Sequence, residues 1–229
     1  DRRQRQMCIR DRLKRMDLTN KLYKVFLIAG SEPLGTAGMQ ADIKSISACG
    51  GYAAGAITCI VDEDTIKVKS IQTIPVEMVV SQTYSFLEDV GADCIKTGML
   101  YSQELVTAIG DVVKKQSIPI VVDPVMVSSA GDKLLQDDAI QAYKDCLFPY
   151  STIITPNRRE ADLLLGKSLT KDNMKEYIPE LSKWGNCVIV KSIEDGDYLI
   201  DVFYNPISKC FKPVSYTHLR AHETCADLV

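Results

Sequence analysis

The stretch KVFLIAGSEPLGTAGMQADIKSISAC, residues 24–49, contains the pattern that decides the fold. After the first lysine it opens with an apolar run, which is typical of a strand buried on both faces of a sheet. A glycine-containing loop follows from Gly30 to Gly38, and residues 38–49 then have the length and spacing of an amphipathic helix. A strand, a loop and a helix in this order form the repeating unit of a parallel sheet covered by helices.

The same alternation continues along the chain, and local signals mark where elements begin and end. Pro75 precedes one helix, Ser102 and Asn157 are suitable N-caps, and Gly166 is a suitable C-cap. Strands are predicted at 24–29, 56–61, 94–96, 118–123, 152–155 and 187–191, with half-exposed strands near a sheet edge at 65–73 and 198–203. Helices are predicted at 38–49, 76–89, 102–115, 137–147, 157–165 and 172–184. We therefore predict an α/β protein, a three-layer α/β/α sandwich with a mainly parallel central sheet.

The composition is that of a globular protein. The chain has 229 residues, 46% hydrophobic and 25% charged, which suits one domain with a sizeable core. It has neither an apolar run long enough to span a bilayer nor a secretory leader, so we expect a cytoplasmic protein with no membrane partner. The eight cysteines form no C-x-x-C pair and have no histidine at metal-ligand spacing, so we expect reduced thiols.

The charge is unevenly distributed between the ends and the body. Residues 1–15 carry a net charge of +5 within a chain of −3, but they lack aromatic side chains and the acidic body has no basic face, so no nucleic-acid partner is predicted. DRRQRQMCIRDR at the start and VSYTHLRAHET near the end resemble translated sequencing-library adapters. We expect a non-native arm at 1–15, a domain at 16–213 that is incomplete at its C-terminus, and a non-native tail at 214–229. Both histidines lie in that tail and are assigned no chemistry.

Several strand ends carry residues with both a structural and a functional interpretation. The loop from Gly30 to Gly38 could bind a ligand or simply turn the chain. Asp42 could accept hydrogen bonds from a ligand or stabilise the start of its helix. In the run Lys96-Thr97-Gly98-Met99-Leu100, the apolar residues could complete the core.

Oxygen-bearing side chains follow two further strands. Asp123 ends an apolar strand, where a buried carboxylate needs a partner or a cation. Asn157 and Glu160 could form a helix capping box, yet together with Asp123 they supply oxygen ligands suited to magnesium bound with phosphates. Lys191 ends the strand CVIVK, where it could be solvated or could meet a nucleotide phosphate.

Taken in order, the motifs resemble those of the hydroxymethylpyrimidine and phosphomethylpyrimidine kinases of thiamine biosynthesis, in the ribokinase-like superfamily. The resemblance runs from about Val25 to Phe211 and rests on AGSEPLGTAGMQADIKSISACGGYAAGAIT, KTGML, DPVMV, SAGD, CLFP and TPN-x-x-E-A. It implies ATP-dependent phosphorylation of 4-amino-5-hydroxymethyl-2-methylpyrimidine and of its monophosphate. Members of the family often form homodimers. A pyridoxal or pyridoxine kinase on the same scaffold and a non-catalytic pyrimidine-binding protein are the alternatives.

The resemblance also implies residue roles. Asp42 would hydrogen-bond the aminopyrimidine, with Gly30 and Met99 lining its pocket. Two more sets are implied at the other strand ends: magnesium would be organised by Asp123 and Glu160, and the nucleotide phosphates would be faced by Asn157 and Lys191.

The chain departs from the family pattern at three places. Glu63 stands where the family usually has glutamine, and we expect it still to meet the exocyclic amine of the pyrimidine with altered selectivity, because an ionised carboxylate only accepts hydrogen bonds. Lys191 and Ser192 begin a segment where the family continues K-G-G-H. The glycine-rich T-H-G-T-G-C-T loop has no counterpart after Phe211, so the catalytic residue is unknown and we expect little or no phosphoryl transfer from this chain.

Overall fold

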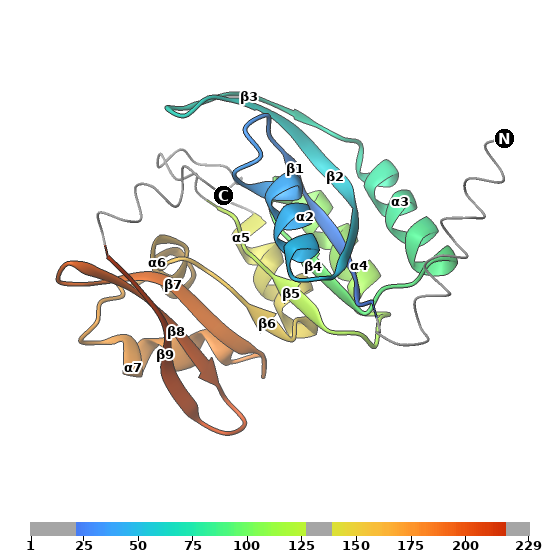
Figure 1. Cartoon of the computed structure of the whole chain (residues 1–229). Coiled ribbons are helices and arrows are strands. Elements are labelled where there is room, and N and C mark those ends of the chain that lie inside the picture. Colours follow the sequence, from blue (N-terminus) through green and yellow to red (C-terminus); the bar gives the residue numbers. More distant parts are fainter. Residues whose placement is uncertain (1–21, 127–138, 219–229) are drawn as a thin grey trace, which may run out of the picture.

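The computed structural model describes residues 22–126 and 139–218, with side chains up to residue 213. Their strands form one sheet in the order β3-β2-β1-β4-β5-β6-β7-β8-β9 (Figure 1). The strands are β1 (Lys24–Ser31), β2 (Tyr52–Glu63), β3 (Val68–Thr73), β4 (Cys94–Thr97), β5 (Ile120–Val122), β6 (Ile153–Ile154), β7 (Cys187–Asp195), β8 (Tyr198–Asn205) and β9 (Cys210–His218). Pairing is parallel from β2 through β1, β4, β5 and β6 to β7, and antiparallel for β3, β8 and β9. The predicted mainly parallel sheet is confirmed.

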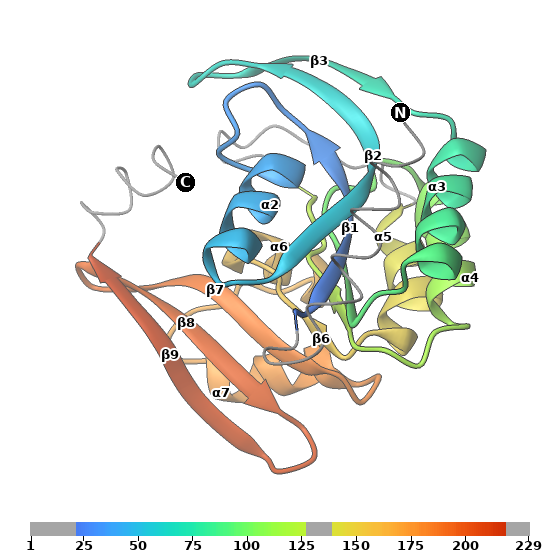
Figure 2. The ribbon, with the colours of Figure 1, turned by 45° about the vertical axis from the view of Figure 1, so that its right-hand side comes forward.

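Helices cover both faces of the sheet. They are α2 (Gly38–Ala48), α3 (Val76–Asp89), α4 (Gln103–Val113), α5 (Ala139–Ala142), α6 (Arg158–Leu165) and α7 (Met174–Tyr177). Because successive strand residues point to opposite faces, Leu27 and Ala29 pack on Met39 of α2, whereas Phe26 and Ile28 join the large core on the other side. Figure 2 shows α2 on one side of β1 and β2, and α3 and α4 on the other. This is the predicted α/β/α arrangement.

The predicted helix ends are observed, but two predicted helices are interrupted. Ser102 caps α4 by accepting a hydrogen bond from the backbone N–H of Leu105, and Gly166 ends α6 in the left-handed region with φ of 66°. The helix predicted at 172–184 is instead α7 followed by a 3-10 turn, Ile178–Ser182, because Pro179 lacks the N–H that a continuous α-helix needs. The helix predicted at 137–147 is α5 followed by a π turn, Tyr143–Leu147, and its first two residues lie outside the described part.

The expected domain boundary at residue 213 falls inside β9. The backbone of this strand pairs with β8 from Cys210 to His218. The expected arm at 1–15 and residues 219–229 of the expected tail lie outside the described residues. Within residues 22–126 and 139–218, none of the helices has the length and apolar character that crossing a bilayer requires.

Candidate active site

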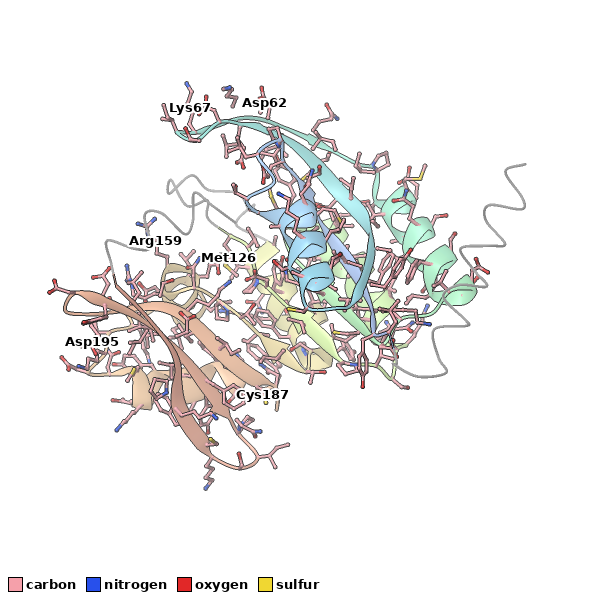
Figure 3. All side chains as sticks on the ribbon, in the orientation of Figure 1. Asp62, Lys67, Met126, Arg159, Cys187 and Asp195 are labelled. Carbon is pink, nitrogen blue, oxygen red and sulfur yellow. The ribbon has the colours of Figure 1, made fainter. Side chains whose placement is uncertain are left out.

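Most of the site residues singled out in the sequence lie where β1, β2, β4, β5 and β6 end. The prediction that Lys191 ends its strand is wrong, because β7 continues to Asp195. Parallel strands present their carboxyl ends at one edge of a sheet, which is where open α/β sheets bind ligands. Figure 3 shows Met126, which follows β5, and Arg159 on α6 between the β2–β3 hairpin, which carries Asp62 and Lys67, and the end of β7 at Asp195. Two groups of side chains occupy this edge, one largely apolar and one charged.

The first group is an apolar wall formed by Gly30, Cys59 and Met99. The Sγ of Cys59 lies 4.0 Å from the Sδ of Met99, and a Cβ on Gly30 would lie 3.0 Å and 3.7 Å from these two atoms. Val61 and Val125 belong to the same group of packed residues. Met99 is only 8% exposed, so it belongs to the core, as the structural interpretation expected, and its contact with a ligand stays a prediction. Sequence reasoning found Gly30 and Met99 but missed Cys59, which looked like any apolar strand residue.

Glu32 organises the glycine-containing loop beside this wall. Glu32 as a whole is 5% exposed, and its carboxylate accepts hydrogen bonds from the backbone N–H groups of Leu34, Thr36 (2.5 Å) and Ala37 (2.9 Å). Burial alone would raise the pKa of Glu32, but these backbone donors lower it below the ordinary value. The loop is therefore held by a charge at its centre. Its sequence signal was an acidic residue directly after a strand and before two glycines.

Glu63 ends β2 close to this loop. Burial raises the pKa of its carboxyl, and the negative charge of Glu32 raises it further. A ligand that presents a hydrogen-bond donor here would relieve part of that cost. The expected contact of Glu63 with an exocyclic amine stays a prediction.

Asp42 of α2 already has a partner within the protein. Its Oδ2 lies 2.6 Å from the Nζ of Lys96 on β4, and both side chains are about a quarter exposed or less. The helix-start interpretation is wrong, because Asp42 is the fifth residue of α2 and lies beyond its first turn. Its carboxylate pairs instead with a lysine 54 residues away. A ring nitrogen or amine that approaches Asp42 would meet the remaining oxygen or compete with Lys96. Sequence reasoning noted Lys96 without giving it a role.

The second group, here called the Asp123 cluster, comprises Asp123, Asn157, Glu160 and Lys191. The Nζ of Lys191 lies 3.0 Å from the Oδ1 of Asp123, and the backbone N–H of Asp123 donates to the carbonyl of Thr97 on β4. Burial works to lower the pKa of Lys191, but Asp123, Glu160 and Asp201 together raise it above the ordinary lysine value. Lys191 is thus a paired ammonium and not a merely solvated one.

Asn157 and Glu160 form the capping box that the sequence allowed. The Oδ1 of Asn157 accepts from the backbone N–H of Glu160 at 2.9 Å, and the Oε2 of Glu160 accepts from that of Asn157 at 2.8 Å. The other carboxylate oxygen accepts from the backbone N–H of Met126. Burial and the nearby charge of Asp123 raise the pKa of Glu160 to about 7, against the opposing effects of the Asn157 N–H and the Lys191 ammonium. The structural interpretation is confirmed, and a ligand role must use the remaining lone pairs.

The Asp123 cluster supplies two carboxylates, which suits a magnesium ion that is also bound by water and phosphates but not a metal site built from protein side chains alone. Among residues 22–126 and 139–218, no group of three or more His, Cys, Asp or Glu side chains is placed to hold a metal. Magnesium, however, is usually bound by one or two carboxylates together with water and substrate phosphates. The high pKa of Glu160 beside Asp123 marks a place where an added cation would be favoured.

A family model agrees with this picture. The model described as phosphomethylpyrimidine kinase matches residues 32–224. The chain belongs to this family. The matched region begins at Glu32 and includes the whole Asp123 cluster.

Relatives and solved structures of the family give the same answer. A probable thiamine biosynthetic bifunctional enzyme, chloroplastic, from Oryza sativa subsp. japonica is 36% identical over 87% of this chain, which spans only 37% of the rice protein. The crystal structure of phosphomethylpyrimidine kinase from Clostridium difficile 630 superposes with a TM-score of 0.77 at 31% identity, covering 86% of each chain. Pyridoxal kinase from Staphylococcus aureus in complex with AMP-PCP and pyridoxal superposes with a TM-score of 0.76 at 31% identity, covering 87% of this chain and 73% of that one. The chain therefore shares its overall fold with a phosphomethylpyrimidine kinase and with a pyridoxal kinase.

Proposed function

We propose that the chain is a kinase of thiamine biosynthesis that uses ATP to phosphorylate the hydroxymethyl group of 4-amino-5-hydroxymethyl-2-methylpyrimidine and then its monophosphate. The observation that carries the proposal is the Asp123 cluster, in which the partly exposed ion pair of Asp123 and Lys191 lies with the buried Glu160 beside an apolar wall, in a member of this family. Phosphoryl transfer is catalysed mainly by positioning and by neutralisation of charge, so such a set is what the reaction needs.

The apolar wall and the residues near it would bind the ring, and the Asp123 cluster would bind the phosphates and the metal ion. The apolar wall takes one face of the pyrimidine ring, while Glu63 and Asp42 meet its amino group and ring nitrogens. Lys191 and the amide of Asn157 face the nucleotide phosphates. Asp123 and Glu160 would hold magnesium, the latter through water, and that ion would neutralise charge on the phosphates.

The nucleotide and the setting of the enzyme are part of the proposal. ATP use is supported by the AMP-PCP complex of the structurally similar pyridoxal kinase. We place the enzyme in the cytoplasm as a homodimer, without a nucleic-acid or membrane partner. No catalytic residue is assigned, because residues 214–229 contain no glycine with which to build an anion-binding loop. The activity proposed above is therefore that of the kinase family to which the chain belongs, and we expect this chain to bind its ligands with little or no turnover.

Pyridoxal is the second candidate substrate. It is favoured by the superposition on a pyridoxal kinase, which is nearly as good as that on the phosphomethylpyrimidine kinase. Glu63 favours the pyrimidine, because its carboxylate can accept from an exocyclic amine that pyridoxal lacks.

Titration calorimetry with each ring compound tests the proposal, with product formation from ATP and magnesium followed by chromatography. We expect the pyrimidine to bind at least tenfold more tightly than pyridoxal, and Glu63→Gln to narrow that ratio. Asp123→Asn should weaken binding of AMP-PCP with magnesium, whereas Asp111→Asn, which alters an exposed aspartate on α4, should not. Failure of the folded chain to bind the pyrimidine would refute the proposal, and tighter binding of pyridoxal would favour the second candidate.

A further inference from the structure

Strand β7 contains one extra residue at the point where Lys191 enters the site. Val188 pairs with Tyr204 and Val190 with Val202, but the next pair joins Ile193 to Ile200, so Lys191 and Ser192 together lie opposite one residue, Asp201. This is a β-bulge, in which two residues of one strand face a single residue of its partner. Figure 1 shows β7, β8 and β9 side by side at this end of the sheet.

The bulge decides which way the side chains of β7 point. Val188, Val190 and Ile193 are all fully buried, so the interval between core residues is two before the bulge and three across it. An unbroken strand would return Ser192, not Ile193, to the core, because side chains alternate between the two faces. The added residue lets Lys191 leave on the side of Asp123 while the core of β7 continues.

Asp201 holds this bulge. Its Oδ1 accepts a hydrogen bond of 2.9 Å from the backbone N–H of Ser192, one of the two bulged residues. Ser192 has φ of 61°, a left-handed conformation that residues other than glycine seldom adopt. The neighbouring N–H of Lys191 is held from the other side by the carbonyl of Pro156. Lys191 is therefore fixed between two backbone contacts, one of which depends on a single side chain.

We infer that Asp201 is a positioning residue that directs the Lys191 ammonium toward Asp123 and the phosphate side of the site by fixing the bulge at Ser192. The inference rests on the proposed function in one part, the assignment of the phosphate to a nucleotide. The geometry of the bulge and of Lys191 does not depend on that function. Asp201 lies on β8 and does not itself contact Asp123 or Glu160, so it acts through Lys191.

A double-mutant cycle on the full chain tests the inference. Wild type, Asp201→Ala, Lys191→Met and the double variant are titrated with AMP-PCP and magnesium, and the same four proteins are unfolded in urea without ligand. We expect Asp201→Ala to weaken AMP-PCP binding about fivefold to tenfold, but less than about twofold in the Lys191→Met background. Asp201→Asn, which keeps the accepting oxygen, should bind AMP-PCP within about threefold of wild type. Glu194→Ala, which removes an exposed carboxylate from β7, is the matched control.

The unfolding experiment separates positioning from simple stabilisation. If Asp201 and Lys191 are coupled, the effect of the double variant on the unfolding equilibrium constant should differ by about fivefold from the effects of the two single variants multiplied together. Effects of Asp201→Ala that are equal in both backgrounds, in binding and in unfolding, would overturn the inference and leave Asp201 a structural residue. If Asp201→Ala does not fold, Asp201→Ser replaces it, because its hydroxyl is too short to span the same distance to the Ser192 N–H.

The two proposals fail in different ways. A wild type that binds no AMP-PCP but shows the coupling in urea would refute the nucleotide role and keep the positioning role. Normal AMP-PCP binding with strictly additive effects would keep the kinase proposal and refute the role of Asp201.

Discussion

Replacing Glu32 by alanine removes the acceptor of three backbone hydrogen bonds at once, those from Leu34, Thr36 and Ala37. Hydrogen bonds to a charged group contribute about 1.5–3 kcal/mol each in a buried setting. Leu34 and Ala37 are exposed, so the freed N–H groups can be rehydrated, and about 1 kcal/mol per bond is the better figure. We therefore expect Glu32→Ala to lower the free energy of unfolding by about 3 kcal/mol. Glu32→Gln keeps one accepting oxygen and should lower it by about 1–2 kcal/mol.

The pH dependence of this effect identifies the carboxylate as its cause. The pKa of Glu32 is lowered in the folded protein, so its contribution to stability is complete above the unfolded value of about 4.3 and is lost as the pH falls through the folded value. Urea unfolding of wild type and Glu32→Gln from pH 7 to pH 3 should show the difference between them shrinking only below about pH 4.3.

Ligand binding provides a second test of the role of Glu32 in this loop. Because the loop borders the apolar wall, Glu32→Ala should also weaken binding of the pyrimidine. Glu77→Ala, which removes an exposed glutamate from the first turn of α3, serves as the control. The reasoning would be refuted by a Glu32→Ala protein whose unfolding free energy matches that of Glu77→Ala, or by a Glu32→Gln difference that stays constant down to pH 3.

Three further predictions follow from single positions. Gly38→Ala should lower the free energy of unfolding by about 3 kcal/mol or more, because its Cβ would lie 2.4 Å from the carbonyl oxygen of Gly30. Gly166 has a similar φ but open space around it, so Gly166→Ala should lower that free energy by only about 1 kcal/mol, as measured by thermal unfolding. The pKa of Glu160 is raised to about 7, so wild type loses stability as the pH rises from about 4.3 to about 7 and the carboxylate ionises. In urea unfolding, the stability difference between wild type and Glu160→Gln should therefore shrink across that pH range. A difference that stays constant would contradict this prediction. Ser192→Gly relieves the left-handed strain at φ of 61° and should raise the melting temperature by about 2 °C, with a fall contradicting this view of the bulge.

Local signals in the sequence predicted most of the elements, and the reasons are visible in the structure. Strands of a doubly covered sheet must be apolar on both faces, so β1 and β7 could be recognised without knowledge of their neighbours. Caps such as Ser102 and Asn157 act within one turn and are equally local. Irregular stretches were harder, because Pro179 converts the end of a helical pattern into a 3-10 turn without changing its apolar spacing.

Partners of the site residues were beyond local signals, because they depend on which strands become neighbours. Asp42 pairs with Lys96 across 54 residues and Asp123 with Lys191 across 68. Glu32 was missed for another reason. Glycines mark a turn in the sequence, but no local signal shows that the carboxylate of Glu32 accepts three backbone hydrogen bonds within that turn.

The Asp123–Lys191 pair joins two expectations that the sequence could state only separately. A carboxylate at the end of a buried strand needed a partner or a cation, and a lysine at the end of another strand needed an anion. In the structure each provides the other's counter-charge at 3.0 Å, so the protein without ligand is already neutralised at this point. A phosphate group that binds Lys191 must then compete with Asp123, and the carboxylate it releases would be free to accept a cation. Nucleotide and metal ion would thereby favour each other's binding, since each takes one partner of the same ion pair.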